Sequence, residues 1–169
     1  MSLKLPMGTR AIPKIHKHAF LSGVISLGVD ITLQKMTRKS IDFKRTSRIV
    51  SFSVVSTYPQ VYYFDALDSI FVKNTLQSAI QKTIVNQIVF APINVSSAIA
   101  WNLFFESKPE LISRQIKSSL IPSISEGASY WIPMNIIAFT KIPAHHRIIF
   151  FKMCSIPYKF IFANRVFKK

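Results

Sequence analysis

The amino-acid sequence predicts an all-α integral membrane protein, a bundle of about four transmembrane helices. Three observations lead to this fold class. The run from Thr83 to Phe105 is 23 residues without a charge, and about 20 apolar residues cross a bilayer as a helix. Mean hydropathy is +0.28 and only 17% of residues are charged, against about 25% in soluble domains. Basic residues gather at the ends of the apolar runs, as they do beside membranes.

The 169-residue chain divides into three parts. We expect a basic N-terminal arm over residues 1–18, a single membrane helical-bundle domain over 19–163, and a basic C-terminal tail over 164–169. The arm carries four basic residues and no acid, as mitochondrial targeting segments do. Two prolines would interrupt a continuous amphipathic helix there, so we favour a basic arm that flanks the membrane.

The expected spans differ in how much charge they contain. The third span is free of charge, whereas the first contains Asp30 and the last is interrupted by Lys152, Pro157 and Lys159. The second contains two aspartates close to its end. We expect a short amphipathic segment between the third and fourth spans. The four spans lie near residues 19–34, 49–72, 83–105 and 144–162.

A soluble helical bundle is the main alternative fold. Its polar connections would be too short to cover this much apolar surface, and the loop from Lys35 to Arg48 is rich in charge, which suits a membrane flank. The spans are nonetheless rich in Ser, Thr, Asn and Gln. Polar groups in a bilayer must find partners within the protein or line water. We therefore expect a membrane bundle with a partly polar interior.

The charge of the chain favours an anionic partner. There are 22 Lys and Arg against 7 Asp and Glu, a net charge of +15, which suits anionic lipid head groups. Nucleic-acid binding is poorly supported, because the basic residues form no stripe with interleaved aromatic residues. The single cysteine, Cys154, and the lack of a Gly-rich phosphate loop or a zinc-protease motif argue against a metal, a cofactor and an enzyme.

Polar residues inside the spans are the first group of candidate site residues. Asp30 and Gln34 lie four residues apart and would share one helix face. An acid within the membrane is a functional hypothesis, with a structural ion pair to an arginine as the alternative. Asn86 and Gln87 place amide groups inside the longest span, where lining a pore and hydrogen bonding between helices both remain open.

Charged residues at the span ends are the second group. Asp42, Arg45 and Arg48 are spaced by three, so they would be helical neighbours at the mouth of the second span. We favour contact with lipid phosphate over a solute clamp there. Arg147 begins the last span, where a cation opposes the helix macrodipole. It should therefore need an anion: a lipid phosphate, an acid such as Asp30, or a passing solute.

Prolines and aromatic residues complete the candidates. Pro92 should kink or widen the third span, because proline frees a carbonyl of the preceding turn. Pro143 suits the first turn of the last span, and Pro133 is a further helix-shaping residue. The aromatic residues expected at the membrane interface are Tyr63, Phe64 and Trp131.

Five short motifs occur in an order that resembles a known family. The pattern Asp-x-x-Arg-Thr-x-Arg matches Asp42–Arg48, and Asp-Gln-x-x-Phe-Ala-Pro matches Asn86–Pro92 with Asn in place of the first Asp. The other three motifs are similar to Gly28–Gln34, Tyr63–Asp68 and Trp131–Arg147. The chain thus resembles the Mpv/PMP family of mitochondrial inner-membrane and peroxisomal membrane proteins. The Gly-Pro-x-x-His usual before the aromatic pair is replaced, so the chain is a divergent member.

The resemblance implies a channel or pore for small solutes in the mitochondrial inner membrane, or alternatively the peroxisomal membrane, that supports metabolite flux and mitochondrial homeostasis. The alternative function is that of a structural, supernumerary subunit of a respiratory or ATP-synthase assembly, which has kept the scaffold without transport. The expected partners are the lipid bilayer, anionic lipid head groups, and either further copies of the chain or a larger membrane complex.

Overall fold

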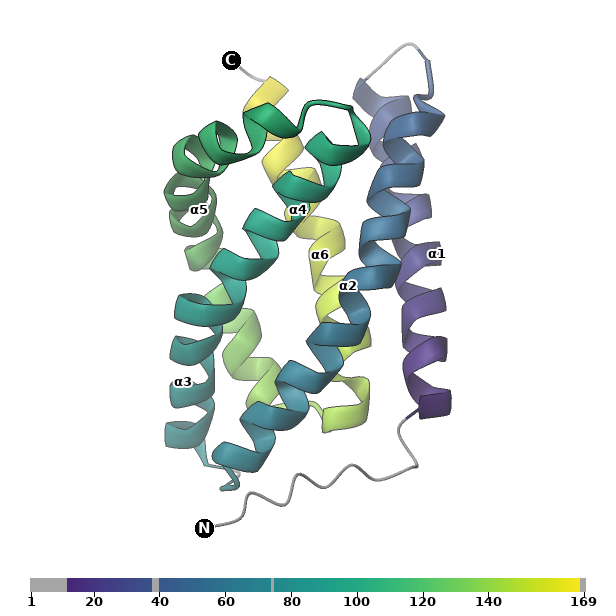
Figure 1. The fold of residues 1–169 in the computed structure, drawn as a ribbon. Helices are drawn as coiled ribbons and strands as arrows, with labels where there is room; N and C mark the ends of the chain where they lie inside the picture. Colours follow the sequence, from purple (N-terminus) through teal and green to yellow (C-terminus); the bar gives the residue numbers. More distant parts are fainter. Residues whose placement is uncertain (1–11, 38–39, 74, 168–169) are drawn as a thin grey trace.

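The structure is a computed structural model that describes residues 12–37, 40–73 and 75–167, with side chains described between residues 15 and 161. All secondary structure in these ranges is helical. Three consecutive elements, α3, the π-helical turn η1 and α4, form one continuous helix, so the fold has five long helices (Figure 1). The elements are α1 (Ile12–Thr37), α2 (Phe43–Ile70), α3 (Leu76–Val85), η1 (Asn86–Phe90), α4 (Ala91–Phe105), the 3₁₀ turn η2 (Pro109–Leu111), α5 (Ile112–Lys141) and α6 (Ala144–Phe167).

The five helices run up and down the bundle in chain order (Figure 1). We call the end where α1 meets α2 the upper end, and the end where α2 meets α3 the lower end, as drawn in Figure 1. The helices α4 and α5 also meet at the upper end, and α5 and α6 meet at the lower end. Short connections between antiparallel neighbours are typical of helical bundles.

The helix α5 corrects the expectation of a short amphipathic segment between the last two spans. It is 30 residues long and contains both Pro122 and Pro133. The two prolines and Glu126 suggest interruptions in the sequence, yet a proline is tolerated in a helix where neighbouring groups satisfy the carbonyl it frees. The bundle therefore has five long helices in place of about four.

The continuous helix Leu76–Phe105 is 30 residues long, with a mean hydropathy of 1.6 in its most apolar window. Among the described helices it is the one that is long and apolar enough to cross a membrane by these criteria. None of that window is buried inside the protein, so the helix is not the apolar core of a soluble bundle. Its apolar surface suits a lipid environment.

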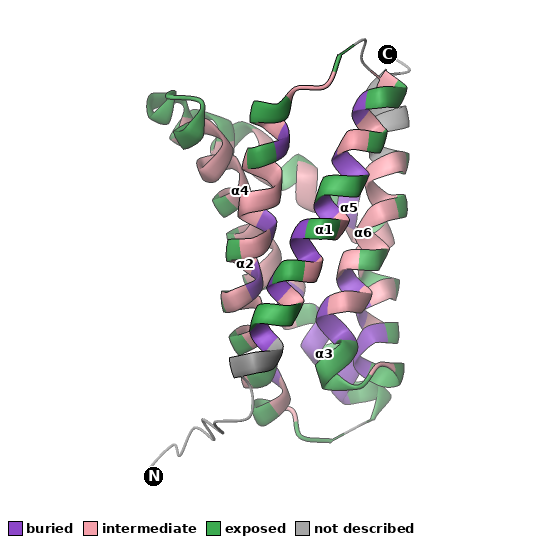
Figure 2. Ribbon diagram, turned by 90° about the vertical axis from the view of Figure 1, so that its right-hand side faces the viewer, coloured by how far each residue is buried: buried purple, intermediate pink, exposed green. Residues whose placement is uncertain are grey.

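Many of the residues buried inside the bundle are polar, and Figure 2 shows how the buried positions are distributed along the helices. Within the described ranges, 13 polar or charged residues are buried against 10 hydrophobic ones, while 23 large hydrophobic residues are exposed. Soluble proteins show the opposite pattern, because a buried polar group requires a partner and exposed apolar area is unfavourable in water. This distribution is the one expected of helices that face lipid outside and polar groups inside.

The helices α1 and α2 pack closely through small residues. A Cβ on Gly23 would lie 2.9 Å from Cγ2 of Val54, so only glycine fits there without a shift. On the same interface the Ser26 hydroxyl donates to Ser53 Oγ at 2.8 Å, and the Thr57 hydroxyl donates to Ser22 Oγ at 3.0 Å. Small residues let helix backbones approach, and hydroxyl groups then bond across the interface.

An aromatic cluster fills the lower part of the bundle. Phe64 is 5% exposed and stacks on Phe151, with ring centroids 5.2 Å apart. Tyr63 stacks on Phe90 at 4.8 Å, and Phe139 meets Phe64 edge to face. Tyr63 and Phe64, expected at the membrane interface, are thus placed inside the protein. Apolar aromatic rings pack at least as favourably against one another as against lipid.

Candidate functional site

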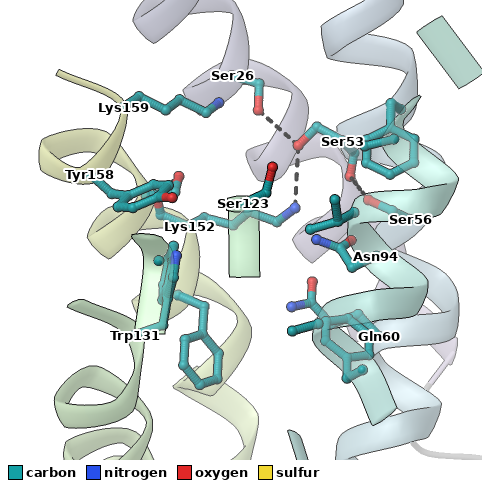
Figure 3. A pocket seen from close by; sticks show the side chains of 18 of the residues that line it. Ser26, Ser53, Ser56, Gln60, Asn94, Ser123, Trp131, Lys152, Tyr158 and Lys159 are labelled. Carbon is teal, nitrogen blue, oxygen red and sulfur yellow. Dashed lines mark hydrogen bonds between the residues drawn. The ribbon is translucent and has the colours of Figure 1, made fainter. Parts of the chain in front are cut away.

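A partly open cavity of about 660 Å³, lined by both apolar and polar side chains, lies among the helices of the bundle. Its wall is contributed by α1, α2, η1, α4, α5 and α6, and Figure 3 shows polar side chains from α1, α2, α4, α5 and α6 around it. Cavities of this size hold small organic molecules. The uncharged polar residues of the wall are Ser26, Ser53, Ser56, Gln60, Asn86, Gln87, Asn94, Asn102, Ser123, Asn135, Ser155 and Tyr158.

The π-helical turn places Asn86 and Gln87 in the cavity wall. The turn comes directly before Pro92, whose ring cannot donate to the preceding turn, and the backbone N–H of Ala91 donates to the Asn86 carbonyl in the wider π pattern. This is the kind of local widening expected from Pro92. A π-helical turn contains one residue more than an α-helical turn, which changes the side chains that face inward. Here the side-chain amides of Asn86 and Gln87 both belong to the cavity wall.

The two amides differ in their partners. Asn86 Nδ2 donates to Asn135 Oδ1 at 2.8 Å, which ties η1 to α5. Asn86 Oδ1 and Gln87 Nε2 are buried atoms with no hydrogen-bond partner among the described residues. A buried amide without a partner is unfavourable unless water or a ligand satisfies it. Both residues belong to the cavity wall, but these two atoms are themselves covered by neighbouring groups.

Asp30 and Gln34 lie together on one face of α1, near the upper end. Asp30 is 3% exposed, and Gln34 Nε2 and Thr46 Oγ1 donate to its Oδ2 at 2.6 and 2.7 Å. Its other oxygen lies 3.4 Å from Arg45 Nη2. The Gln34 carbonyl accepts from the backbone N–H of Asp42 at 2.6 Å. The network joins the last turns of α1 to the start of α2, while Asp30 and Arg45 also line the cavity.

The remaining charges predicted at the second span's mouth have separate roles. Asp42 is the N-cap of α2, and its side chain accepts from the backbone N–H of Arg45 at 2.9 Å, as N-cap residues do. Arg48 pairs with Glu106 at 2.8 Å and so ties α2 to the end of α4. Of the three residues, Arg45 is the one that reaches the cavity.

Arg147 lies at the lower end, outside the cavity, and is 5% exposed. Its Nη1 donates to Asp68 Oδ2 at 2.7 Å, and Lys82 Nζ donates to the other oxygen of Asp68, also at 2.7 Å. Its Nε donates to the carbonyl of Ala138 at 3.3 Å, where α5 ends. The anion that Arg147 needs is thus Asp68, and the C-terminus of α5 adds a favourable dipole. We call Asp68, Lys82 and Arg147 the lower charge cluster.

Trp131, expected at the membrane interface, lies in the cavity wall. Its ring packs against Tyr158 with centroids 5.3 Å apart, and a Cβ on Gly127 would lie 3.2 Å from Trp131 Cδ1 and from the Tyr158 hydroxyl oxygen. Pro133, on the same helix, is exposed, and Pro143 directly precedes the first residue of α6. The His146 N–H donates to the Pro143 carbonyl at 2.9 Å, so Pro143 opens that helix.

Sequence reasoning missed the two lysines of the cavity, Lys152 and Lys159. The sequence suggests that they interrupt the last span, but both lie on α6 and line the cavity wall (Figure 3). Seven residues make about two helical turns, so their spacing already places them on one face. Lys152 Nζ donates to Ser53 Oγ at 3.3 Å. Among the described residues, neither lysine lies within salt-bridge distance of a carboxylate.

The described residues include no group of three or more His, Cys, Asp or Glu side chains placed to hold a metal ion. Cys154 is half-buried, and its backbone carbonyl accepts a hydrogen bond from the Tyr130 hydroxyl at 2.6 Å. The ring of Tyr130 packs against the ring of Tyr158. What the cavity does offer is hydrogen bonding and positive charge, a combination suited to binding and passage of a polar molecule.

Comparison with known proteins shows that the chain is similar to one family over its C-terminal part and to several proteins over most of its length. The model of the Mpv17 / PMP22 family matches residues 98–163, from within α4 into α6. PXMP2/4 family protein 4 of Dictyostelium discoideum is 26% identical over 163 residues, which cover 90% of this chain and 82% of that protein. PXMP2/4 family protein 3 of the same organism is 29% identical over 143 residues, covering 80% and 75%. No solved structure matches the chain. The match to the family model over residues 98–163 and the two relatives agree with the buried polar residues and the exposed apolar surface: the chain is similar to membrane proteins of the Mpv17 / PMP22 family.

Proposed function

We propose that the chain is a channel for small solutes in the mitochondrial inner membrane, where it supports metabolite flux. The observation that carries the proposal is a cavity of about 660 Å³, lined by polar as well as apolar side chains, among helices that expose 23 large hydrophobic residues. Buried polar residues need partners or water, and a cavity with hydrogen-bonding groups in a bilayer supplies a place for a small solute. Proteins of this family are generally non-enzymatic.

The charged residues support passage in two different ways. Arg45 and Asp30 are in the cavity wall and present charge to a solute directly. Arg48 and Arg147 are paired with acids from other helices and stabilise the two ends of the bundle. We propose that the first pair influences which solutes pass, as charged rings do in other pores, and that the second pair holds the helices around the path.

Efflux from liposomes tests the pore. The full-length protein, reconstituted in liposomes loaded with a small neutral polyol, should release it faster than protein-free liposomes and should retain a large oligosaccharide. Ser123→Phe places a phenyl ring in the cavity and should lower the efflux rate several-fold, whereas Ser125→Phe, at an exposed position on the same helix, should not. Efflux equal to that of empty liposomes, or equal for both variants, would contradict the proposal.

The location is a separate proposal. Members of this family reside in mitochondrial inner or peroxisomal membranes, and the basic N-terminal arm favours the mitochondrion. The first eleven residues lie outside the described part of the chain. Subfractionation with carbonate extraction should recover the protein in the inner-membrane pellet; recovery with peroxisomal membranes would assign the alternative.

A structural subunit is the second candidate function, and the aromatic residues at the lower end of the cavity favour it. Phe64, Phe90 and Phe151 form its lower wall, and the lower charge cluster lies at the same end. A solute would cross only if these groups moved, whereas a scaffold needs no such movement. Blue-native electrophoresis distinguishes the two: co-migration with a respiratory or ATP-synthase complex favours the subunit, and migration alone or as a small homo-oligomer favours the channel.

A further inference from the structure

The side-chain ammonium groups of Lys152 and Lys159 both belong to the cavity wall, and neither forms a salt bridge with a carboxylate of the described residues. Lys152 and Lys159 extend from α6 across the cavity, towards Ser53 and Ser26 on the opposite helices (Figure 3). The acid in the cavity wall is Asp30, and it is held by Arg45 at 3.4 Å. A lysine enclosed in a bundle without an anion is unfavourable, because few water molecules solvate its charge.

The charge of the cavity wall defines what would neutralise it. Its ionisable side chains comprise the cations Arg45, Lys152 and Lys159, the carboxylate of Asp30 and the phenol of Tyr158. With Asp30 and Arg45 paired, two positive charges remain, on two side chains set two helical turns apart. A molecule with two negative charges would balance them, whether the charges lie on two carboxylates or on one phosphate group.

The rest of the wall suits an organic anion. The Ser123 hydroxyl lies beside the two lysines and can donate to an oxygen atom of a ligand (Figure 3). The hydroxyls of Ser26 and Ser53 already donate to Ser53 Oγ and to the Ser22 carbonyl. On another side the rings of Trp131 and Tyr158 provide an apolar surface for a short carbon skeleton. Ligand sites commonly combine an apolar wall with a few convergent polar groups.

We infer that the cavity binds a small organic dianion, a dicarboxylate or a phosphate monoester, between Lys152 and Lys159. The inference deepens the proposed function and rests on it, because it identifies the chemical class of the solute that occupies the path. Carboxylate and phosphate oxygens both accept charge-assisted hydrogen bonds from ammonium groups, so the structure points to their shared chemistry.

Calorimetric titration of the full-length protein in detergent tests binding apart from transport. Succinate represents the dicarboxylates and glycerol 3-phosphate the phosphate monoesters, with erythritol as the neutral control and putrescine as the cationic one. We expect saturable binding of at least one dianion and none of the two controls. Whichever of the two dianions binds more tightly identifies the anionic group, carboxylate or phosphate, that the site prefers. Equal binding of erythritol and succinate, or no binding of either dianion, overturns the inference.

Substitutions assign the site. Lys152→Gln and Lys159→Gln should each weaken dianion binding roughly tenfold, and both together roughly a hundredfold, because each removes a charged donor. Lys152→Arg keeps the positive charge, so its affinity for the dianion should stay within a few-fold of that of the unchanged protein. Lys141→Gln removes an exposed lysine at the end of α5, away from the cavity wall, and should leave the affinity unchanged. Unchanged affinity in the double variant overturns the assignment.

Polyol efflux measured on the same variants separates this inference from the proposed function. If the double variant loses dianion binding but still releases the neutral polyol, it is folded, and both the site and the pore stand. If the unchanged protein binds dianions yet releases no solute, the site stands and the pore does not. If it releases polyol but binds no dianion, the pore stands and the dianion site does not.

Discussion

Asp68 is the residue on which the lower end of the bundle depends. It accepts from Lys82 and Arg147 at 2.7 Å each, and so joins α2, α3 and α6. Both cations also lie over the ring of Phe139, with Arg147 Cζ 4.9 Å from its centroid. Three helices are therefore held through one carboxylate, and each cation loses its anion if that carboxylate is removed.

Asp68→Asn should destabilise the protein by about 2 kcal/mol. Removing one partner of a buried pair leaves an uncompensated charge, at about 3–5 kcal/mol, and the partial exposure of Asp68 reduces this figure. Thermal unfolding in detergent measures the loss. Asp65→Asn, at an exposed position three residues earlier on α2, is the control and should change stability little. Equal losses in both variants would contradict the role of Asp68.

The sequence predicts contacts between residues that are close together in the chain better than contacts between residues that are far apart in it. The four-residue spacing of Asp30 and Gln34 predicts a shared helix face, and the structure joins them at 2.6 Å. The requirement of Arg147 for an anion also follows from its position at a helix N-terminus. Its partner does not follow, because Asp68 lies 79 positions away in the chain and only the packing of α2 against α6 brings the two together.

At the scale of the elements, the tightest helix pair is α1 with α2, and it depends on a glycine. Gly23 faces Val54 closely, whereas nothing lies within 4 Å of a Cβ added at Gly28 on the same helix. The two positions are thus a natural matched pair: the same substitution is made in a packed interface at one site and in open space at the other.

Gly23→Leu should lower stability by about 1–3 kcal/mol, because overpacking forces Val54 and the helix to shift. Gly28→Leu should change it by no more than about 0.5 kcal/mol, as surface substitutions do. The difference in melting temperature between the two detergent-solubilised variants measures the effect. A Gly23 variant as stable as the Gly28 variant would show that the helices are less closely packed than described.

Two elements show where the sequence misleads. The prolines of α5 and the lysines of α6 both suggest that a helix is interrupted. A search of the sequence for uniformly apolar runs therefore does not recognise these two segments as membrane spans. In the structure Pro122 and Pro133 lie inside one 30-residue helix, and Lys152 and Lys159 face the interior. The sequence contains the seven-residue spacing of the lysines, but the cavity that makes it meaningful is formed by six elements together.

At the scale of the whole molecule, the cavity is bounded below by aromatic rings. Phe151 belongs both to the buried core cluster and to the cavity wall, and it stacks on Phe64. Such a layer excludes water and polar solutes, as hydrophobic constrictions do in channels. The resting conductance of the proposed channel should therefore depend on how tightly these rings pack.

Phe151→Ala should raise polyol efflux several-fold while lowering stability by about 3–5 kcal/mol, because it removes a ring from the barrier and leaves a cavity. The liposome assay and thermal unfolding measure the two effects. Phe104→Ala, which removes a ring that is 64% exposed on the outer surface of α4, should alter neither strongly. An efflux rate that falls or stays constant in Phe151→Ala would show that the rings are not the barrier.

The hydroxyl pairs between α1 and α2 also bear on how the protein is made. Inserted alone, α1 would carry Ser22, Ser26 and Asp30 into lipid with no partner from another helix, and an acid at that depth is strongly unfavourable. Their partners Thr57, Ser53 and Thr46 all lie on α2. We therefore expect the two helices to enter the bilayer as a hairpin, with synthesis of α2 required before α1 becomes resistant to extraction.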